Sequence, residues 1–377
     1  MQKMIAAMFL AGMVAATPHS LAAIQASPEA IAPFVAREID DGVHLLATPL
    51  DYRGDVIGNI TVIEQQDGMV VIDSGGAAAD GRRVVSYIRS ITPKPVKALV
   101  FTHWHGDHPQ GASEIRAAWP RMRVIATPQT RDSLRTAASR YMGFEPDDRF
   151  ETIRLNQTSG MISQLEAGIR NPATDEETRV RYTRMLAQNR ARRPDFRGTY
   201  LIMPTEVFSE ELILADPVRP VRLLYLGRAN TDGDAIAWLP NQRIVVTGDV
   251  LVHPIPFGFG SFPGPWLEVL GRIEALGYRV LIPGHGEPQT DSVYLDQVAA
   301  TLRDLRAQIT PLAQQGLSLE DVRERVNWDA QREIFGTTAR NRILIDAFWL
   351  TPMTVNTYRE ARGLPMIQGD EEIYSDD

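Results

Sequence analysis

The chain has 377 residues, of which 44% are hydrophobic and 23% charged, and its net charge is −8. This balance is typical of a globular protein with a sizeable core, and the acidic charge argues against nucleic acid as a partner, because phosphate binding needs a concentrated basic surface. No cysteine is present, so disulfides and thiolate chemistry are excluded, and any metal must be held by His, Asp, Glu or amide oxygen.

Residues 1–22 have the pattern of an export signal. Lys3 gives a short positive start, residues 4–16 are almost all apolar, and small residues lead to a plausible cleavage point after Ala22. The apolar run is too short to span a bilayer comfortably, since a membrane-spanning helix needs about 20 residues. The sequence therefore predicts a cleaved signal peptide and a periplasmic or secreted protein without stable membrane insertion.

Short β-rich runs and segments of helical spacing follow in an order that predicts an α/β layered architecture. The Asp-Gly pair at 67–68 indicates a hairpin between two of the strands. Strands are expected at 43–47, 60–64, 69–72, 96–101, 123–126, 207–214, 221–226, 235–239, 243–247 and 279–282. Helices are expected at 81–91, 111–118 and 266–276.

Two further helical regions accompany a main domain that we expect over residues 34–290. Residues 132–193 lack β-rich runs and predict a helical insertion, residues 291–369 a C-terminal helical extension, and residues 370–377 an acidic tail. The insertion carries a group of basic residues, Arg181, Arg184, Arg190, Arg192 and Arg193. We interpret them as a solvated helix face balanced by nearby glutamates, the alternative being a lid that attracts anionic substrates.

The strongest chemical signal is Thr-His-Trp-His-Gly-Asp-His at residues 102–108, directly after a hydrophobic strand. His103 and His105 are two apart, so on an extended segment they point the same way. The glycine permits a sharp turn, after which Asp107 and His108 can face a second position. Histidine is the commonest protein ligand for zinc-like metals, so this run predicts a metal site.

Two more candidate ligands follow strands farther along the chain. Asp249 comes after the strand at 243–247, and His285 comes after the strand at 279–282, each beside glycines. In open α/β sheets, sites form from the loops at strand ends. We therefore expect both side chains to join the histidine-rich turn.

These residues give the chain a resemblance to the metallo-β-lactamase superfamily over residues 43–288, and the Asp249 pattern is similar to the glyoxalase II branch. Asp73-Ser74-Gly75 resembles the family's early Asp-Thr-Gly turn. The resemblance implies an αββα sandwich with a dinuclear zinc centre. The first zinc would take His103, His105 and a third histidine, the second would take Asp107, His108 and His285, and Asp249 would bridge them.

The chain departs from the family pattern at the third histidine of the first site, where the segment at 227–234 places Asn230. An amide oxygen is a weaker zinc ligand than imidazole. We therefore expect one well-held ion, with the other site weak, exchangeable or filled by a different divalent metal. His253 could reach the pocket, but a surface or pocket-wall role is favoured.

The expected activity is hydrolysis of an ester, thioester, lactone or β-lactam bond of a small molecule by a metal-activated hydroxide, which Asp107 would orient. The alternatives are phosphodiester or sulfate ester hydrolysis, and a non-catalytic protein whose first site is degenerate at Asn230. The aromatic and glycine-rich run at 256–263 suits a mobile apolar loop at the pocket mouth.

Overall fold

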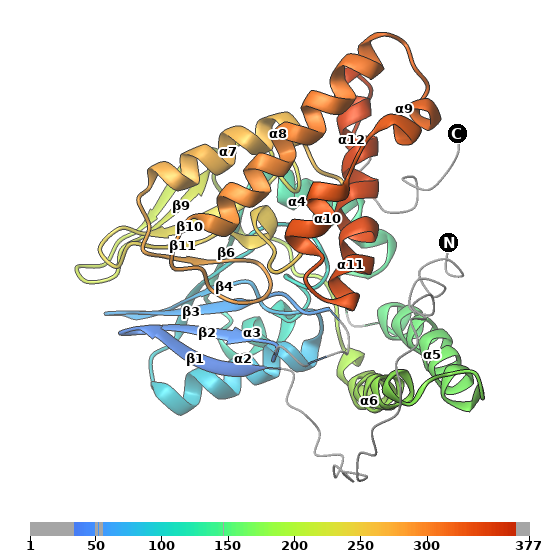
Figure 1. The fold of residues 1–377 in the computed structure, drawn as a ribbon. Coiled ribbons are helices and arrows are strands. Elements are labelled where there is room, and N and C mark those ends of the chain that lie inside the picture. Colours follow the sequence, from blue (N-terminus) through green and yellow to red (C-terminus); the bar gives the residue numbers. More distant parts are fainter. Residues whose placement is uncertain (1–33, 50–51, 53–55, 146, 367–377) are drawn as a thin grey trace.

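The computed structural model describes residues 34–49, 52, 56–145 and 147–366. The predicted signal peptide and acidic tail lie outside these residues. Within the described part of the chain, no helix is both long and apolar enough to cross a membrane. Two sheets lie face to face with helices on the outer side of each (Figure 1), which confirms the predicted αββα sandwich.

The first sheet has seven strands in the order of the chain. Its first four strands pair antiparallel, and the last three continue parallel to the fourth. The predicted hairpin between the third and fourth strands is present, with its turn at Gln66-Asp67 directly before Gly68. The strands are β1 (Val35–Asp40), β2 (Val43–Ala47), β3 (Ile60–Gln65), β4 (Gly68–Ile72), β5 (Val96–Val100), β6 (Arg123–Ala126) and β7 (Glu206–Val207).

The second sheet has five strands. Its two strands latest in the sequence pair in parallel, and all other neighbouring strands are antiparallel. Its order from one edge to the other is β12, β11, β10, β9 and β8. The strands are β8 (Glu211–Leu214), β9 (Val221–Tyr225), β10 (Ala235–Leu239), β11 (Ile244–Val246) and β12 (Val280–Ile282).

The core between the sheets explains why the central strands are apolar on both faces. All residues of β2, β4 and β10 are buried, because one face of each sheet meets the other sheet and the other face meets helices. The outer helices are α2 (Ala78–Ile91), α3 (Ala112–Ala118) and α4 (Pro128–Thr136) on the first sheet, and α7 (Pro263–Ala275) and α8 (Val293–Gln314) on the second.

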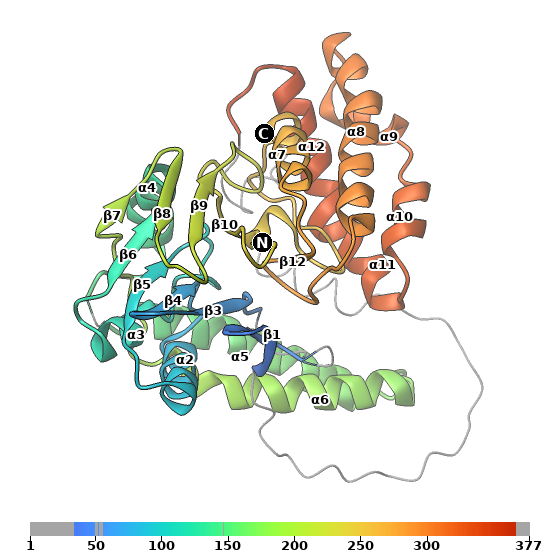
Figure 2. The same cartoon turned by 90° about the vertical axis from the view of Figure 1, so that its left-hand side faces the viewer.

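The predicted helical insertion lies between β6 and β7 and contains two long helices that extend side by side away from the sandwich (Figure 2). They are α5 (Arg149–Arg170) and α6 (Glu176–Arg192), with short turns η1 (Ala138–Arg140) before them and η2 (Arg193–Phe196) after them. The interpretation of the basic group as a solvated face is wrong for Arg192. Its side chain is 3% exposed and pairs with the fully buried Asp80 of α2.

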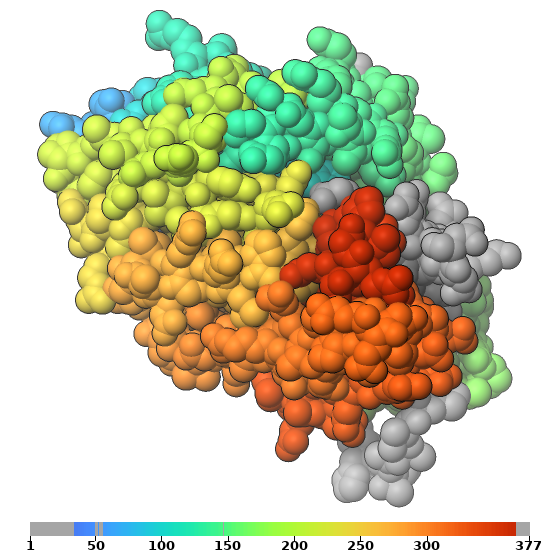
Figure 3. Space-filling model, turned by 90° about the horizontal axis from the view of Figure 1, so that it is seen from above, coloured from blue at the N-terminus to red at the C-terminus, as the bar shows by residue number. Residues whose placement is uncertain are grey.

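The C-terminal region packs on the second sheet as the outer helical layer, and Figure 3 shows it in orange and red beside the yellow segments. Trp349 is fully buried with its ring 5.3 Å from that of Trp266 in α7. After α8 the elements are α9 (Leu319–Arg325), α10 (Asp329–Phe335), α11 (Ala339–Ile345), the π-helical turn η4 (Asp346–Leu350) and α12 (Thr351–Ala361).

Two sequence-based expectations about strands need correction. The run at 207–214 is not one strand, because it leaves the first sheet after β7 and enters the second sheet as β8. The expected start of β structure at residue 43 also misses β1, whose residues are half-exposed or exposed. An edge strand that buries little apolar surface gives a weak hydrophobic signal.

Candidate metal centre

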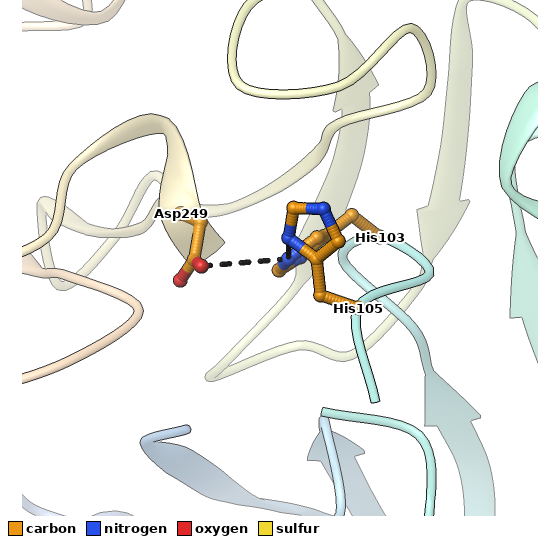
Figure 4. A group of neighbouring side chains, drawn as sticks. All are labelled: His103, His105 and Asp249. Carbon is orange, nitrogen blue, oxygen red and sulfur yellow. Dashed lines mark hydrogen bonds and ion pairs between the residues drawn. The ribbon is translucent and has the colours of Figure 1, made fainter. Parts of the chain in front are cut away.

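The first group of candidate ligands comes from the loop that follows β5. His103 is fully buried, and its Nε2 lies 3.0 Å from Nδ1 of His105. The hydroxyl of Thr102 lies 3.0 Å from Nδ1 of His103, so the opposite ring nitrogen faces the centre. Asp249 Oδ2 lies 3.5 Å from His103 Nε2 (Figure 4). Ligand atoms of these two histidines and Asp249 fall within 4.8 Å of one another, and we call this set the first cluster.

The second cluster joins the end of the same loop to the loop after β12. Its members are Asp107, His108 and His285, with ligand atoms again within 4.8 Å of one another. His285 Nε2 lies 3.0 Å from Asp107 Oδ2 and 3.3 Å from His108 Nε2. The predicted convergence of distant loops is therefore present in the structure.

Asp249 connects the two clusters. It lies in the short turn η3 (Gly248–Val250) after β11 and is 4% exposed. While Oδ2 faces His103, Oδ1 lies 3.2 Å from His108 Nε2 and 3.4 Å from His285 Nε2. A Cβ on Gly284 would lie 2.0 Å from Asp249 Oδ1, so only glycine leaves room for this carboxylate.

Asp73 is a supporting residue whose role the sequence analysis missed. It follows β4 with a φ of 61°, and its carboxylate accepts hydrogen bonds from the backbone N–H and the hydroxyl of Thr102 at 2.8 and 2.7 Å. Asp73 Oδ2 also lies 2.8 Å from Nδ1 of His108, which leaves Nε2 of that ring for the centre. The Asp73-Ser74-Gly75 turn was the available signal, but the sequence did not reveal its partners.

Asn59 is a second supporting residue, and no sequence pattern singled it out. Its side chain is 6% exposed and donates to the carbonyls of Pro283 and Gly286 at 2.9 and 3.0 Å. Its backbone N–H donates to the carbonyl of Gly284 at 2.7 Å. Asn59 therefore holds the loop that carries His285.

We expect Asn59→Ala to weaken zinc binding at the second cluster by about 10- to 100-fold, as is typical when a group that orients a ligand is lost. Titration of the metal-free protein with zinc, followed by calorimetry, measures the change. Asn241→Ala is the matched control, because Asn241 donates to the carbonyl of Val218 in an exposed turn. Equal zinc affinity in both variants would contradict the role given to Asn59.

Comparison with known proteins fits this geometry. A sequence model of the metallo-beta-lactamase superfamily matches residues 53–285. The chain belongs to this superfamily. It is accordingly a metal-dependent hydrolase with an MBL (metallo-β-lactamase) fold, and its two His/Asp clusters are consistent with divalent metal binding.

Individual relatives support the fold assignment. The chain is 25% identical over 261 residues to a linear primary-alkylsulfatase from Pseudomonas sp., covering 66% of this chain and 45% of that protein, so it spans less than half of the relative's length. A sec-alkylsulfatase structure from Pseudomonas sp. superposes with a TM-score of 0.57 at 15% identity, over 89% of this chain and 51% of that chain. A metallo-beta-lactamase from Pontibacter korlensis gives a TM-score of 0.50 at 16% identity, over 72% of this chain and 99% of that chain.

The donor set of the MBL centre fits zinc. Imidazole nitrogens and carboxylate oxygens are the ligands that zinc accepts besides thiolate. Asp249 Oδ1 is buried among the imidazole nitrogens of the second cluster. Asn230 Oδ1 is buried without a hydrogen-bond partner within the described residues, and a buried acceptor of this kind is available as a ligand.

Two other predicted positions have different outcomes. The segment that carries Asn230 lies next to the first cluster, since the following Ala235 N–H donates to the carbonyl of Thr102 at 2.7 Å. His253 belongs to neither cluster. Its ring packs 4.9 Å from that of Tyr294, and its backbone N–H donates to the carbonyl of His285 at 3.1 Å. His253 thus has the expected wall role behind the second cluster.

The carboxylates govern protonation at the metal-free centre. Burial by itself lowers the pKa of His285, but Asp249 and Asp107 outweigh it and raise that pKa to about 9. Burial is likewise outweighed by these two carboxylates at His108, whose pKa lies well above the usual value. His105 shows the opposite result, since burial and the neighbouring His103 lower its pKa to about 3. The second cluster therefore holds protons near neutral pH, and His105 does not.

Zinc and protons should therefore compete at the second cluster. Because His285 must lose a proton to bind metal, zinc affinity should rise as the pH is raised from 6.5 to 8.5 and approaches its pKa. The stability of the metal-free protein should fall over the same range, because the raised pKa of His285 stabilises the fold only while the ring is protonated. Zinc calorimetry and urea unfolding across this range measure the two trends. A pH-independent zinc affinity would contradict this account.

Proposed function

We propose that the protein is an exported hydrolase that cleaves the sulfate ester of an alcohol with an apolar chain. The proposal rests on an aromatic group beside the first cluster. The Phe257 ring lies 5.7 Å from that of His105, and the rings of Phe259 and Phe348 lie 5.0 and 6.0 Å from that of Phe257. Phe257 and Phe348 are only partly buried, so they offer an apolar surface to a substrate.

The aromatic group indicates the chemistry of the substrate on either side of the bond that is cleaved. Contact with an alkyl chain removes apolar surface from water and contributes about 25 cal/mol per Å². An ionic head group would then lie toward the clusters, where bound cations compensate its charge. A sulfate monoester of an aliphatic alcohol has both parts, and the similarity to a primary-alkylsulfatase supports this class of substrate.

Zinc ions, when bound, would activate a water molecule and polarise the ester. The chain's own groups would orient the reaction. The Asp107 side chain is 21% exposed and lies 3.0 Å from His285 Nε2, so it faces both the centre and solvent. Interaction with His108 and His285 holds its pKa well below the usual value against the effect of burial. Asp107 therefore stays an acceptor at neutral pH and can orient the attacking water.

Turnover of decyl sulfate, followed by inorganic sulfate release, tests the proposal. We expect zinc-dependent turnover and a lower KM for decyl sulfate than for butyl sulfate. Phe257→Ala and Phe348→Ala should raise KM for decyl sulfate by about 10-fold, which corresponds to about 1.4 kcal/mol of lost apolar contact, and should leave butyl sulfate unchanged. Phe144→Ala, at a position 39% exposed in the insertion, is the matched control. No sulfate release by the zinc-loaded protein would overturn the proposal.

Hydrolysis of carboxylic esters, thioesters, lactones or β-lactams is the second candidate. The position of Asp249 between the two clusters favours it, because this was the feature that resembled the glyoxalase II-like branch. Decyl acetate and decanoyl thioesters share the alkyl chain and change only the reacting group. Faster turnover of these substrates than of decyl sulfate would favour the second candidate.

Export is part of the proposal and depends on residues 1–22. The periplasmic or extracellular form should begin at Ala23, which mass spectrometry of the mature protein would show. An intact N-terminus in the cell cytoplasm would contradict it.

A further inference from the structure

The two polar atoms of the Asn230 amide have different surroundings. It is fully buried, and its Nδ2 donates to the carbonyl of Phe257 at 2.6 Å. Its Oδ1 has no hydrogen-bond partner within the described part of the chain. Because a carbonyl only accepts hydrogen bonds, the amide nitrogen must face Phe257, and the oxygen must point the other way.

The turn around Asn230 is held rigidly beside the first cluster. The Asp234 carboxylate accepts from the backbone N–H of Ala229 at 3.2 Å and of Thr231 at 2.8 Å. The backbone N–H of the next residue, Ala235, donates to the carbonyl of Thr102, the residue before His103. Phe257, which fixes the amide, has its ring against His105. These contacts hold the segment that carries Asn230 beside both histidines.

The peptide between Phe257 and Gly258 is itself held from the C-terminal helices. Its N–H donates to the carbonyl of Phe348 in η4 at 2.8 Å, and its C=O accepts from Asn230. The C=O and N–H of a trans peptide point in opposite directions. The hydrogen bond of the Gly258 N–H therefore sets the direction of the Phe257 C=O, and the two aligned hydrogen bonds strengthen one another.

Asn356 in α12 completes this anchor. It is fully buried, and its Nδ2 donates to the carbonyl of Gly258 at 2.8 Å and to the hydroxyl of Ser261 at 3.0 Å. A Cβ on Gly258 would lie 2.7 Å from Cγ of Met353, also in α12. The loop after Asp249 thus packs closely against α12, where a Cβ on Gly258 would clash with the Met353 side chain.

We propose that the C-terminal helices complete the first metal site by orienting Asn230, so that its Oδ1 serves as a neutral third ligand beside His103 and His105. Asn356 and the Phe348 carbonyl act as positioning groups. An amide suits this position better than a carboxylate would, because the amide nitrogen donates to the Phe257 carbonyl, whereas a carboxylate oxygen would face that carbonyl as a second acceptor. Asn230→Asp would therefore disturb this contact as well as the ligand, and it is not the informative variant. The inference rests on the metal binding of the proposed function and requires no particular substrate.

Zinc titration of the metal-free full chain tests the inference, with calorimetry for affinity and cobalt absorption spectra for ligand geometry. Asn230→Leu keeps the side-chain size and removes the amide, and it should weaken one ion by at least 10-fold while the other ion is retained. Asn356→Leu should weaken the same ion by about 3- to 10-fold and change the same cobalt bands. Thr354→Val is the matched control, because Thr354 is buried in α12 and donates to the carbonyl of Leu350.

A double variant separates positioning from a general loss of stability. If Asn356 acts through Asn230, Asn356→Leu should have no further effect on zinc binding in the Asn230→Leu background. Additive losses, or a loss in Thr354→Val equal to that in Asn356→Leu, would overturn the positioning role. Unchanged zinc affinity in Asn230→Leu would overturn the ligand itself. All of these measurements use zinc binding and none uses alkyl sulfate turnover. Failure of the substrate proposal would therefore leave the zinc-binding results unchanged.

Discussion

Asp249→Asn should remove zinc from both clusters and lower turnover by more than about 100-fold, a larger loss than that expected for groups that only orient ligands. Each carboxylate oxygen faces a different cluster, Oδ2 toward His103 and Oδ1 toward His108 and His285. The amide has the same shape but carries no charge, so the variant separates electrostatics from packing. Elemental analysis of the purified protein and zinc titration measure the metal loss directly.

The same substitution should also change the protonation of the metal-free protein. Asp249 is the main carboxylate that raises the pKa of His285 against the effect of burial, so this pKa should fall in Asp249→Asn, as NMR titration of the imidazoles would show. Asp304→Asn is the control, since Asp304 accepts from two glutamine side chains in the C-terminal helices. Retention of two tightly bound zinc ions in Asp249→Asn would rule out its connecting role.

Arg192→Met should destabilise the protein by about 3 kcal/mol, the range found when one partner of a buried ion pair is removed. Arg192 contacts both oxygens of Asp80, at 2.7 and 2.6 Å, with side chains 3% and 0% exposed. Asp80 also accepts from the backbone N–H of Gly76 at 3.0 Å. Arg83 remains at 3.0 Å from Asp80, so the loss should fall at the low end of the range. Urea unfolding measures it, and hydrogen exchange should localise the loss to α5 and α6.

Arg190→Met is the matched control for this prediction, because it removes the same side chain from the same helix. Arg190 pairs with Glu166 at the surface, with side chains 57% and 30% exposed. Exposed pairs contribute about 0 to 1 kcal/mol, so the control should be nearly neutral. Asp80→Leu combined with Arg192→Met should recover part of the loss, because no charge is then buried without a partner. An equal loss in the two single variants would show that burial of Arg192 is unimportant.

Local patterns were sufficient to predict most of the sandwich. The strands at 43–47, 123–126 and 235–239 were predicted with the bounds that the structure has, because fully buried strands are short apolar runs between turn residues. The strand predictions failed where tertiary packing decides which residues are buried. β1 is an exposed edge strand, and the 207–214 run divides between two sheets, which alternation along the chain does not reveal.

The candidate metal ligands were also predictable from short sequence motifs. His103, His105, Asp107 and His108 lie within six residues, and Asp249 and His285 follow strands whose ends meet at one edge of the sandwich. By itself the sequence therefore determined the layered fold, the candidate ligands and the amide at position 230. The supporting groups were not predictable in this way, since Asn59 acts on the loop after β12 across more than 220 residues and Asn356 acts on a loop 98 residues away.

Only the tertiary structure decided which way the Asn230 amide faces and that Arg192 is buried rather than solvated. The physical reason is that residue type and spacing set what a side chain can donate, accept or ligate. Its partners and its distance from water depend on which distant segments pack against it.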